Sequence, residues 1–435
     1  MAEVFTVNGG KWGDEGKGKV VDFLAQDATV VIRANGGDNA GHTVVNNFGT
    51  FPLHLIPSGI FNPDAICMIG ADTAVNLSVL IQEMKLLEES GVSTKNLRLS
   101  KKAHLVFDYH IEADRLNEMA KAKDKQAVGT TQRGIGPAYE DKAARIGIRA
   151  GELLNPVGFK EHLKRNLKEK AQRYGLRTEF LESNYDGFIE EAINVVAPLV
   201  VDTEEITHQR LGRRSERFLL EGAQGTILSI THGRYPKVTS CDTTANGLLM
   251  AAGIPARYLT RSFGIYKAYD TCVGAGGFPT ELLDESGKPT PQHIYIRTTG
   301  GEIGTTTGRD RRVGFFDGVA ARYSYQINGF SDIVVTRLDT LAGVGELKIC
   351  DSYQLGDQIV TRFPADDELL SQCQALYGSK RYTWGGMADI RETHRFDDLD
   401  YMIQDYCGDI MTFFPEARLY GVGTGPARKD LITLP

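Results

Sequence analysis

The sequence predicts an α/β fold in which a mostly parallel central sheet is flanked by helices. Three observations support this prediction. Short runs of β-branched and aromatic residues end in glycine-rich turns, stretches with helical spacing follow them, and the two kinds of segment alternate along the chain. The 435 residues are enough to bury a substantial core. No low-complexity linker or internal repeat interrupts them, so we expect a single domain over residues 1–435.

The first half of the alternation is clear in the order of the chain. Residues 4–7 form the first expected strand and end at a glycine pair. Residues 19–24 begin a helix, and residues 29–33 form a second strand before another glycine-rich loop. Residues 65–70 and 77–89 repeat the strand and the helix. This order is typical of parallel strands joined by helical crossovers.

The middle of the chain departs from this alternation. Between about 100 and 220 it is richer in Lys and Glu at helical spacing, as in residues 157–172 and 188–196. We therefore expect a helical insertion in the α/β domain. Strands resume at residues 217–220 and again at residues 333–336.

Composition excludes several classes of protein. The net charge is −7, so a broad basic surface for nucleic acid is not expected. No apolar run is long enough to span a membrane and no signal peptide is visible, so we expect a cytoplasmic enzyme without a membrane partner. The six cysteines show no CxxC pair, which favours reduced thiols over a disulfide framework or a zinc site: Cys67, Cys241, Cys272, Cys350, Cys373 and Cys407.

The first glycine-rich loop predicts a phosphate site. Glycines allow backbone N–H groups to converge on an anion, and lysines add positive charge. Gly13, Gly18 and Lys19 match part of a P-loop, which predicts a P-loop-NTPase-like fold, but Val20 stands where the magnesium-binding Ser or Thr belongs. Asp14 would repel phosphate unless it held a cation or exchanged a proton. The alternative is a solvated Asp that caps the next helix.

The second loop supplies a partner for Asp14. His42 lies among small residues that admit a ligand close to the backbone, and histidine exchanges protons near neutral pH. A purely structural histidine is the alternative. We expect both loops at the carboxyl ends of adjacent strands, where open α/β sheets bind ligands.

Further loops have the same glycine, threonine and arginine character. They cover residues 129–137, 221–226, 304–312 and 336–339, and the third of these concentrates three cations. Each alone could be plain solvated surface. Together they predict a multiply charged substrate.

These segments together resemble adenylosuccinate synthetases over almost the whole chain. The motifs that carry the resemblance are WGDEGKGK (12–19), NAGHT (39–43), HLIPSGI (54–60), DYH (108–110), GTT-x-RGIGPAYEDK (129–142), EGAQGT (221–226), VGAG (273–276), FPTEL (278–282), TTGR-x-RR (306–312) and TGP (424–426). The resemblance implies a C–N ligase of AMP synthesis. In that family GTP phosphorylates the 6-oxygen of IMP, and the amine of L-aspartate then displaces the phosphate to give adenylosuccinate, GDP and phosphate.

The resemblance also assigns residues, position by position. It implies that Asp14 is the base at N1 of the purine, that His42 is the acid at the 6-oxygen, and that Gln224 joins them as a catalytic residue. It places the nucleotide monophosphate at Asp14, Lys17, Asn39, His42, Thr131, Arg145, Gln224, Thr239 and Arg309. It places GTP at Gly13, Asp14, Glu15, Gly16, Lys17, Gly18, Lys19, Gly41, His42, Thr43, Arg311, Arg337, Leu338, Asp339, Gly423, Thr424 and Gly425. It places aspartate at Thr305, Thr306, Thr307, Gly308, Arg309 and Arg311, and one Mg²⁺ at Asp14 and Gly41.

Two of these assignments have a further consequence. Arg145 matches an arginine that the family contributes from the neighbouring subunit, which implies a homodimer. An ionised carboxylate only accepts hydrogen bonds, so Asp339 fits the N1–H and 2-amino donors of guanine and predicts GTP rather than ATP.

The chain departs from the family pattern at several positions. Lys11 replaces Gln, Phe315 replaces Trp, Arg337 replaces Lys, and Gly423 replaces Ser. The segments 229–242 and 272–277 lose two carboxylates, an Arg and a Pro, and gain two cations.

These departures leave two alternatives to the IMP reaction. One is a specialised paralogue that acts on another purine nucleotide such as dGMP. The other is a silent nucleotide-binding regulator. Because Asp14, His42 and the arginine loop are retained, we place the IMP reaction first.

Overall fold

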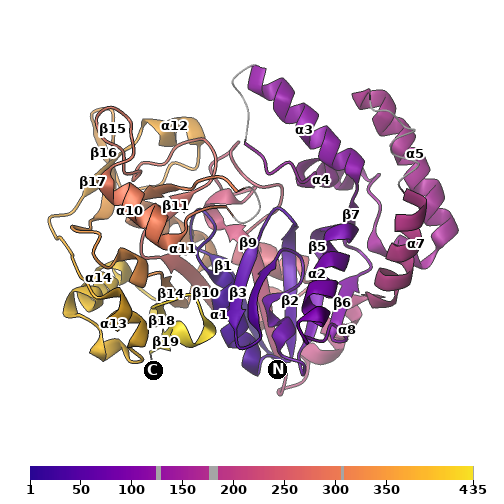
Figure 1. Ribbon diagram of the computed structural model, residues 1–435, viewed down its shortest axis with the longest axis horizontal. Coiled ribbons are helices and arrows are strands. Elements are labelled where there is room, and N and C mark those ends of the chain that lie inside the picture. The colour runs from indigo at the N-terminus through magenta and orange to yellow at the C-terminus, as the bar shows by residue number, and fades with distance from the viewer. Residues whose placement is uncertain (124–128, 176–184, 305–307, 435) are drawn as a thin grey trace.

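A large sheet forms the centre of the molecule, as the computed structural model shows for residues 1–123, 129–175, 185–304 and 308–434 (Figure 1). Its strands are β1 (Glu3–Gly9), β2 (Val30–Gly37), β5 (Ile66–Asn76), β6 (Leu97–Ser100), β7 (His104–Val106), β8 (Val200–Val201), β9 (Arg217–Gly225), β10 (Leu259–Lys267), β14 (Asp332–Thr336), β18 (Arg418–Gly423) and β19 (Leu431–Thr433). Their order is β19-β18-β14-β10-β1-β9-β2-β5-β6-β8, and β7 also pairs with β5. Only β18 and β19 pair antiparallel among these described strands. The predicted fold class is therefore confirmed.

Helices cover both faces of this sheet. On one face α1 (Lys17–Leu24) and α2 (Leu77–Glu89) pack on β1 and β2 through a large apolar cluster that includes Val7 and Val31. On the other face α9 (Ala245–Ala251) packs on Val30 and neighbouring side chains. Side chains alternate along each strand, so a central strand needs apolar residues in both directions.

The other elements form smaller layers around the sheet. The helices are α3 (Asp108–Lys123), α4 (Ile135–Ala144), α5 (Pro156–Tyr174), α7 (Tyr185–Val196), α8 (Thr203–Leu211), α10 (Pro291–Gly300), α11 (Gly318–Asn328), α12 (Asp367–Gln372), α13 (Met387–Glu392) and α14 (Tyr401–Met411). The short strands are β3 (His42–Asn46), β4 (Gly49–Leu53), β11 (Asp270–Cys272), β12 (Arg312–Gly314), β13 (Phe316–Asp317), β15 (Ile349–Leu355), β16 (Gln358–Val360) and β17 (Gln374–Tyr377). Helices α3, α5 and α7 gather at one side of the molecule, on the right in Figure 1.

One topological expectation is wrong. The strands β1 and β2, which precede the two glycine-rich loops, are not adjacent, because β9 pairs with both and lies between them. Phe218, Leu219 and Leu220 place buried apolar side chains on both faces of β9, which suits a strand in the middle of a covered sheet. The insertion of β9 also brings a third loop, with Gln224 at its start, between the other two.

Buried polar contacts tie the helical region together. The ring Nε2 of His110 on α3 lies 3.1 Å from Oδ2 of Asp141 on α4, and Lys170 on α5 pairs with the other oxygen of Asp141. These side chains are almost fully buried, so the three helices are held in a fixed arrangement.

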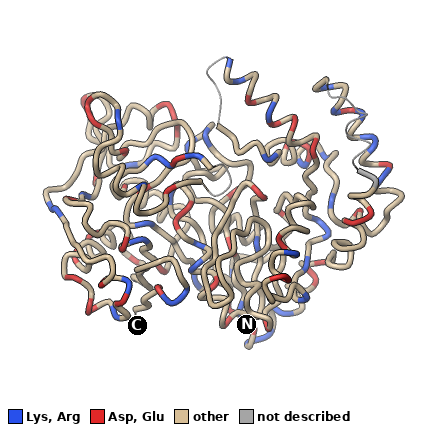
Figure 2. Tube along the Cα trace, in the orientation of Figure 1, with Lys and Arg blue, Asp and Glu red and all other residues tan. Residues whose placement is uncertain are grey.

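The distribution of charged residues and the state of the cysteines are those expected from the composition. Cations and anions are spread over the whole trace without separating into regions of one sign (Figure 2). All six cysteines are free and buried. Among the described helices none is both long and apolar enough to cross a membrane.

Candidate active site

A cavity of about 500 Å³ opens where the loops after β1, β2, β9 and β14 meet. Carboxyl ends of parallel strands are the usual ligand-binding edge of such a sheet. The cavity brings together sixteen of the residues predicted from the sequence: Gly13, Asp14, Gly16, Lys17, Gly18, Lys19, Asn39, Gly41, His42, Thr43, Thr131, Gln224, Thr239, Arg311, Arg337 and Gly425.

The first loop presents the open N-terminus of α1 to this cavity. Gly16 precedes the helix with φ 84°, a left-handed conformation that favours glycine, and no side chain of the described residues caps the helix. The free N–H groups and the helix dipole therefore point at the space where an anion can bind. The end of β9 packs closely against this loop. A Cβ at Gly225 would lie 2.3 Å from the carbonyl oxygen of Lys11, so this position has no room for a side chain.

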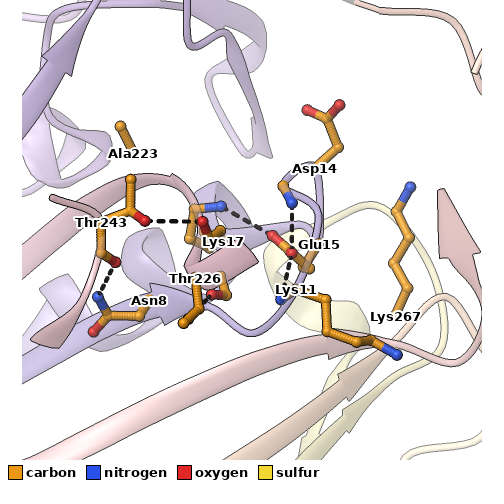
Figure 3. Close-up of polar contacts among 12 residues, drawn as sticks. Asn8, Lys11, Asp14, Glu15, Lys17, Ala223, Thr226, Thr243 and Lys267 are labelled. Carbon is orange, nitrogen blue, oxygen red and sulfur yellow. Dashed lines mark hydrogen bonds and ion pairs between the residues drawn. The ribbon is translucent and has the colours of Figure 1, made fainter. Parts of the chain in front are cut away.

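Glu15 and Asp14 have different places in this loop (Figure 3). The Glu15 carboxylate is buried and accepts hydrogen bonds from the backbone N–H groups of Lys11, at 3.0 Å, and Gly13, at 2.8 Å. It also pairs with Lys17 at 3.2 Å. Glu15 thus braces the loop and does not line the cavity, although it was expected among the GTP contacts. The Asp14 side chain points away from Glu15 and is about one-third exposed, at 32%.

Asp14 is paired with an arginine from the predicted aspartate loop. Nε of Arg311 lies 3.0 Å from Oδ2 of Asp14, an ion pair without hydrogen-bond geometry. Nη1 of the same guanidinium donates to Oε2 of Glu302 at 2.6 Å. Arg311 is therefore shared between the carboxylate in the cavity and a carboxylate behind it.

Glu302 is the centre of a buried ionic cluster, and no sequence motif points to this residue. Its side chain is fully buried and accepts hydrogen bonds from Lys267 at 2.8 and 2.9 Å and from the Tyr269 hydroxyl at 2.5 Å. Burial opposes ionisation, but the charges of Lys267, Arg311 and Arg337 outweigh it and lower the pKa of Glu302 to about 2. Burial in turn lowers the pKa of Lys267 to about 8.

His42 is backed by a second buried carboxylate, Glu221. The nearest carboxylate oxygen lies 3.5 Å from the ring Nε2, and neither ring nitrogen has a hydrogen-bond partner among the described residues. Glu221 is itself held by Arg33 at 3.1 Å and by the backbone N–H of Ser58 at 2.8 Å. Burial, with the positive charge of Arg33, holds the pKa of His42 well below its usual range, so the imidazole is neutral at neutral pH. His42 lies on the wall of the cavity, where phosphate oxygens of a ligand would supply a partner for its ring.

Positive backbone φ angles occur at five non-glycine residues of the described chain, and three of them, Asp14, Gln224 and Arg337, line the cavity. Among the described residues, the non-glycine residues with positive φ are Asp14 (61°), Gln132 (55°), Arg145 (64°), Gln224 (52°) and Arg337 (67°). Four of the five are predicted site residues. Such conformations cost about 1–3 kcal/mol each and persist where the surrounding structure enforces them, often at functional sites.

The predicted guanine residues lie at and behind the far end of the cavity, where Arg337 and Gly425 line it. Leu338, Asp339 and Thr424 are buried beside the carboxyl ends of β14 and β18 rather than on the cavity wall. Lys19 donates to the carbonyl oxygen of Gly425 at 2.8 Å. A Cβ at Gly423 would lie only 2.4 Å from Nζ of Lys19, so the glycine that replaces serine there makes room for this lysine.

Some predicted residues lie away from this cavity or outside the described residues. Arg145 is exposed at the end of α4 and does not line the cavity of its own chain. Arg309 is exposed and donates to the carbonyl oxygens of Gly129 and Thr130 at 3.2 and 3.3 Å. Gly308 lies in the same exposed loop, whereas Thr305, Thr306 and Thr307 lie outside the described residues.

The two segments that depart from the family pattern contact one another. Arg234 is 1% exposed, and its guanidinium donates to the carbonyl oxygen of Gly277 at 2.8 Å and to Sγ of Cys272 at 3.1 Å. It also lies 5.0 Å from the ring centre of Trp12. One arginine thus joins segment 229–242 to segment 272–277 and to the first loop, which makes the departures a connected set rather than scattered changes.

Comparison with known proteins identifies close relatives of the whole chain. The sequence profile of the adenylosuccinate synthetase family matches residues 6–432. An adenylosuccinate synthetase of Geobacillus kaustophilus is 45% identical over 438 residues, which is 99% of each chain. The structure of fully ligated adenylosuccinate synthetase from Plasmodium falciparum covers all of both chains with a TM-score of 0.90 and 32% identity. A cyanophage S-2L succinoaminodeoxyadenylate synthetase, bound to dGMP and dATP, shares the fold with a TM-score of 0.60 and 19% identity, covering 100% of this chain and 96% of the other.

Proposed function

Because the chain belongs to the adenylosuccinate synthetase family, we propose that its central cavity is where it joins L-aspartate to IMP with GTP. The activity is that of a C–N ligase of purine biosynthesis, as in the full-length relatives. The observation that carries the assignment to this cavity is the meeting of Asp14, His42 and the open N-terminus of α1 on one wall.

Residues of different loops have different roles in the proposed reaction. Phosphoryl transfer depends mostly on alignment and on positive charge around the transferring group. The N-terminus of α1 with Lys17 supplies that charge beside the triphosphate. Asp14 takes the proton from N1 of IMP, and His42 donates a hydrogen bond to the 6-oxygen as it receives the phosphoryl group.

Gln224 lies at the end of β9, on the wall of the same cavity. Its side-chain oxygen is buried without a hydrogen-bond partner among the described residues, as expected for a group that meets its partner on the substrate.

The pKa of His42 has a consequence for this step. A neutral imidazole has one N–H to donate, and which nitrogen carries it depends on its partner. Bound phosphates would bring negative charge next to the ring and so favour its protonated form. Glu221 would then stabilise that charge from behind, at the 3.5 Å distance present here.

The donor set of the loops suits one Mg²⁺. Mg²⁺ is usually held by one or two carboxylates together with substrate phosphates rather than by an all-protein cage. Asp14 supplies a partly exposed carboxylate and Gly41 a backbone carbonyl on the same cavity wall, and the described residues contain no cluster of three metal-binding side chains. Bound there, Mg²⁺ would neutralise charge on the phosphates.

Aspartate and guanine would occupy opposite ends of the site. Arg311 offers a guanidinium whose forked donors can bind a carboxylate in two places. Residues 305–309 also belong to the proposed aspartate site. At the other end Asp339, with Arg337, Leu338 and the 423–425 segment, forms the proposed guanine site. We further propose a cytoplasmic location, as in the family.

A substrate matrix tests the function directly. Purified protein is given IMP, GMP or dGMP, each with GTP or ATP, aspartate and Mg²⁺, and the nucleotide product is identified by mass. We expect adenylosuccinate from IMP with GTP, and little product from the other pairs. A product from dGMP with IMP poorly used would contradict the assignment and implicate the segments joined by Arg234. Binding of nucleotides without phosphate release would indicate a silent regulator.

Arg145 provides a test of the proposed homodimer. If Arg145 completes the site of the partner subunit, Asp14→Asn and Arg145→Leu chains should each be inactive alone but active when mixed. Random reassociation gives half heterodimers with one intact site each, so about one quarter of wild-type activity should return. A mixture that stays inactive, although exchange of subunits is demonstrated by mass, would contradict a shared site.

A further inference from the structure

We propose that Arg391 determines the specificity for the purine base of the nucleoside triphosphate, acting through Asp339. This inference rests on the proposed function, in which Asp339 meets the guanine base. Arg391 lies on α13, about fifty positions beyond Asp339, and no motif of the sequence points to it.

The two oxygens of the Asp339 carboxylate have different surroundings. Nε and Nη2 of Arg391 both donate to Oδ2, at 2.9 and 2.7 Å. The other oxygen, Oδ1, is buried and has no hydrogen-bond partner among the described residues. The side chain as a whole is only 2% exposed. A buried carboxylate oxygen without a hydrogen-bond donor raises the free energy of the folded protein. Hydrogen-bond donors of a bound ligand would satisfy Oδ1.

The same segment also fixes the backbone at Asp339. The indole N–H of Trp384 donates to the carbonyl oxygen of Leu338 at 3.3 Å. The N–H of Gly343 donates to the carbonyl oxygen of Trp384 at 2.8 Å. Residues 384–391 therefore hold both the main chain and the carboxylate of the proposed guanine segment.

This arrangement distinguishes guanine from adenine. Guanine presents N1–H and a 2-amino group, both donors, whereas the corresponding N1 of adenine is an acceptor that an ionised carboxylate repels. Discrimination requires that Asp339 stays ionised although it is buried. Arg391 supplies the opposite charge on one oxygen and leaves the other free to accept. An ion pair between two exposed groups would contribute little, but here one partner is buried, so removal of Arg391 leaves the carboxylate without its charged partner.

The test compares Arg391→Met with a matched control, Arg395→Met, whose side chain is 74% exposed and pairs only with exposed carboxylates. kcat/KM is measured with GTP and with ATP at saturating IMP and aspartate. We expect Arg391→Met to lower the ratio of kcat/KM with GTP to kcat/KM with ATP at least about tenfold, through a higher KM for GTP with little change in kcat, because two charge-assisted hydrogen bonds to Asp339 are lost. The control should keep the wild-type ratio. Arg391→Lys keeps a charge without the fork and should give an intermediate ratio; it decides the question if the methionine variant does not fold.

Three outcomes would overturn the inference. If Arg391→Met lowered kcat/KM equally with GTP and with ATP, Arg391 would have a merely structural role. A lower KM for GTP in Arg391→Met would mean that Arg391 covers the base site instead of shaping it. An unchanged ratio would mean that Asp339 discriminates without help. Asp339→Asn in the same assay separates this inference from the proposed function. If Asp339→Asn keeps the preference for GTP, the guanine assignment itself is wrong. If Asp339→Asn loses that preference but Arg391→Met keeps it, only the role of Arg391 is contradicted.

Discussion

Replacement of Asp14 by Asn is expected to lower kcat at least about 1,000-fold, because the proposed proton acceptor and its negative charge are lost together. Asn is the matched substitution at this position. Asp14 has φ 61°, and Asn tolerates that left-handed conformation nearly as well as Asp. Asn also keeps the size of the side chain, which is 32% exposed. The rate is measured as phosphate release that requires GTP, IMP and aspartate, and the melting temperature reports the fold.

Two further variants complete this experiment. Asp14→Ala should also abolish turnover, but it removes the ion pair with Arg311, and its Cβ-only side chain at positive φ adds strain of roughly 1 kcal/mol, so this variant should be less stable as well. Asp64→Asn changes an exposed carboxylate elsewhere on the surface and should leave kcat and melting temperature unaltered. If Asp14→Asn kept more than a tenth of the wild-type kcat in a folded protein, Asp14 would not be the base.

The fold could be predicted because its elements have local signals. The helix α2 begins and ends at the predicted residues 77 and 89, since an apolar stripe defines it and the side chain of Asn76 caps its first turn. The strands β1 and β14 were found within two residues, because each is a short apolar run that ends at a polar or glycine-rich turn. The position of β9 between β1 and β2 has no local signal. It depends on pairing between strands more than 180 residues apart in the chain.

The site divides in the same way. Glycine-rich loops after strands predict a cavity at the carboxyl edge, and the loops with Asp14, His42 and Gln224 indeed line one. The residues behind these loops could not be predicted. Glu221 lies in the EGAQGT motif without an assigned role, and Glu302 lies in none of the motifs; only the folded chain brings them within 3.5 Å of His42 and 2.6 Å of Arg311. A residue that supports another side chain from a distant part of the sequence does not belong to a recognisable sequence pattern.

Replacement of Glu302 by Gln is expected to destabilise the protein by about 3 kcal/mol or more, because it removes one partner from a buried ionic cluster. The neutral amide would leave Lys267 and Arg311 without their common anion, and its NH₂ group would face their donors. The free energy of unfolding is measured by denaturant titration. Glu285→Gln, on an exposed loop of the same half of the chain, is the control and should be neutral.

A double variant and a pH series distinguish the ionic cluster from a simple packing effect. Lys267→Met removes the opposite charge, so Glu302→Gln in that background should cost clearly less than in the wild type. The pKa of Glu302 is lowered to about 2, below the ordinary value for a glutamate, so its contribution is fully present above about pH 4.5 and fades as the pH falls toward 2. The stability difference between the wild type and Glu302→Gln should therefore narrow in acid. If the losses of unfolding free energy in the two single variants simply added up in the double variant, and the effect of Glu302→Gln did not change with pH, Glu302 would stabilise the protein by packing alone. Arg311 would then be held at Asp14 by some other contact.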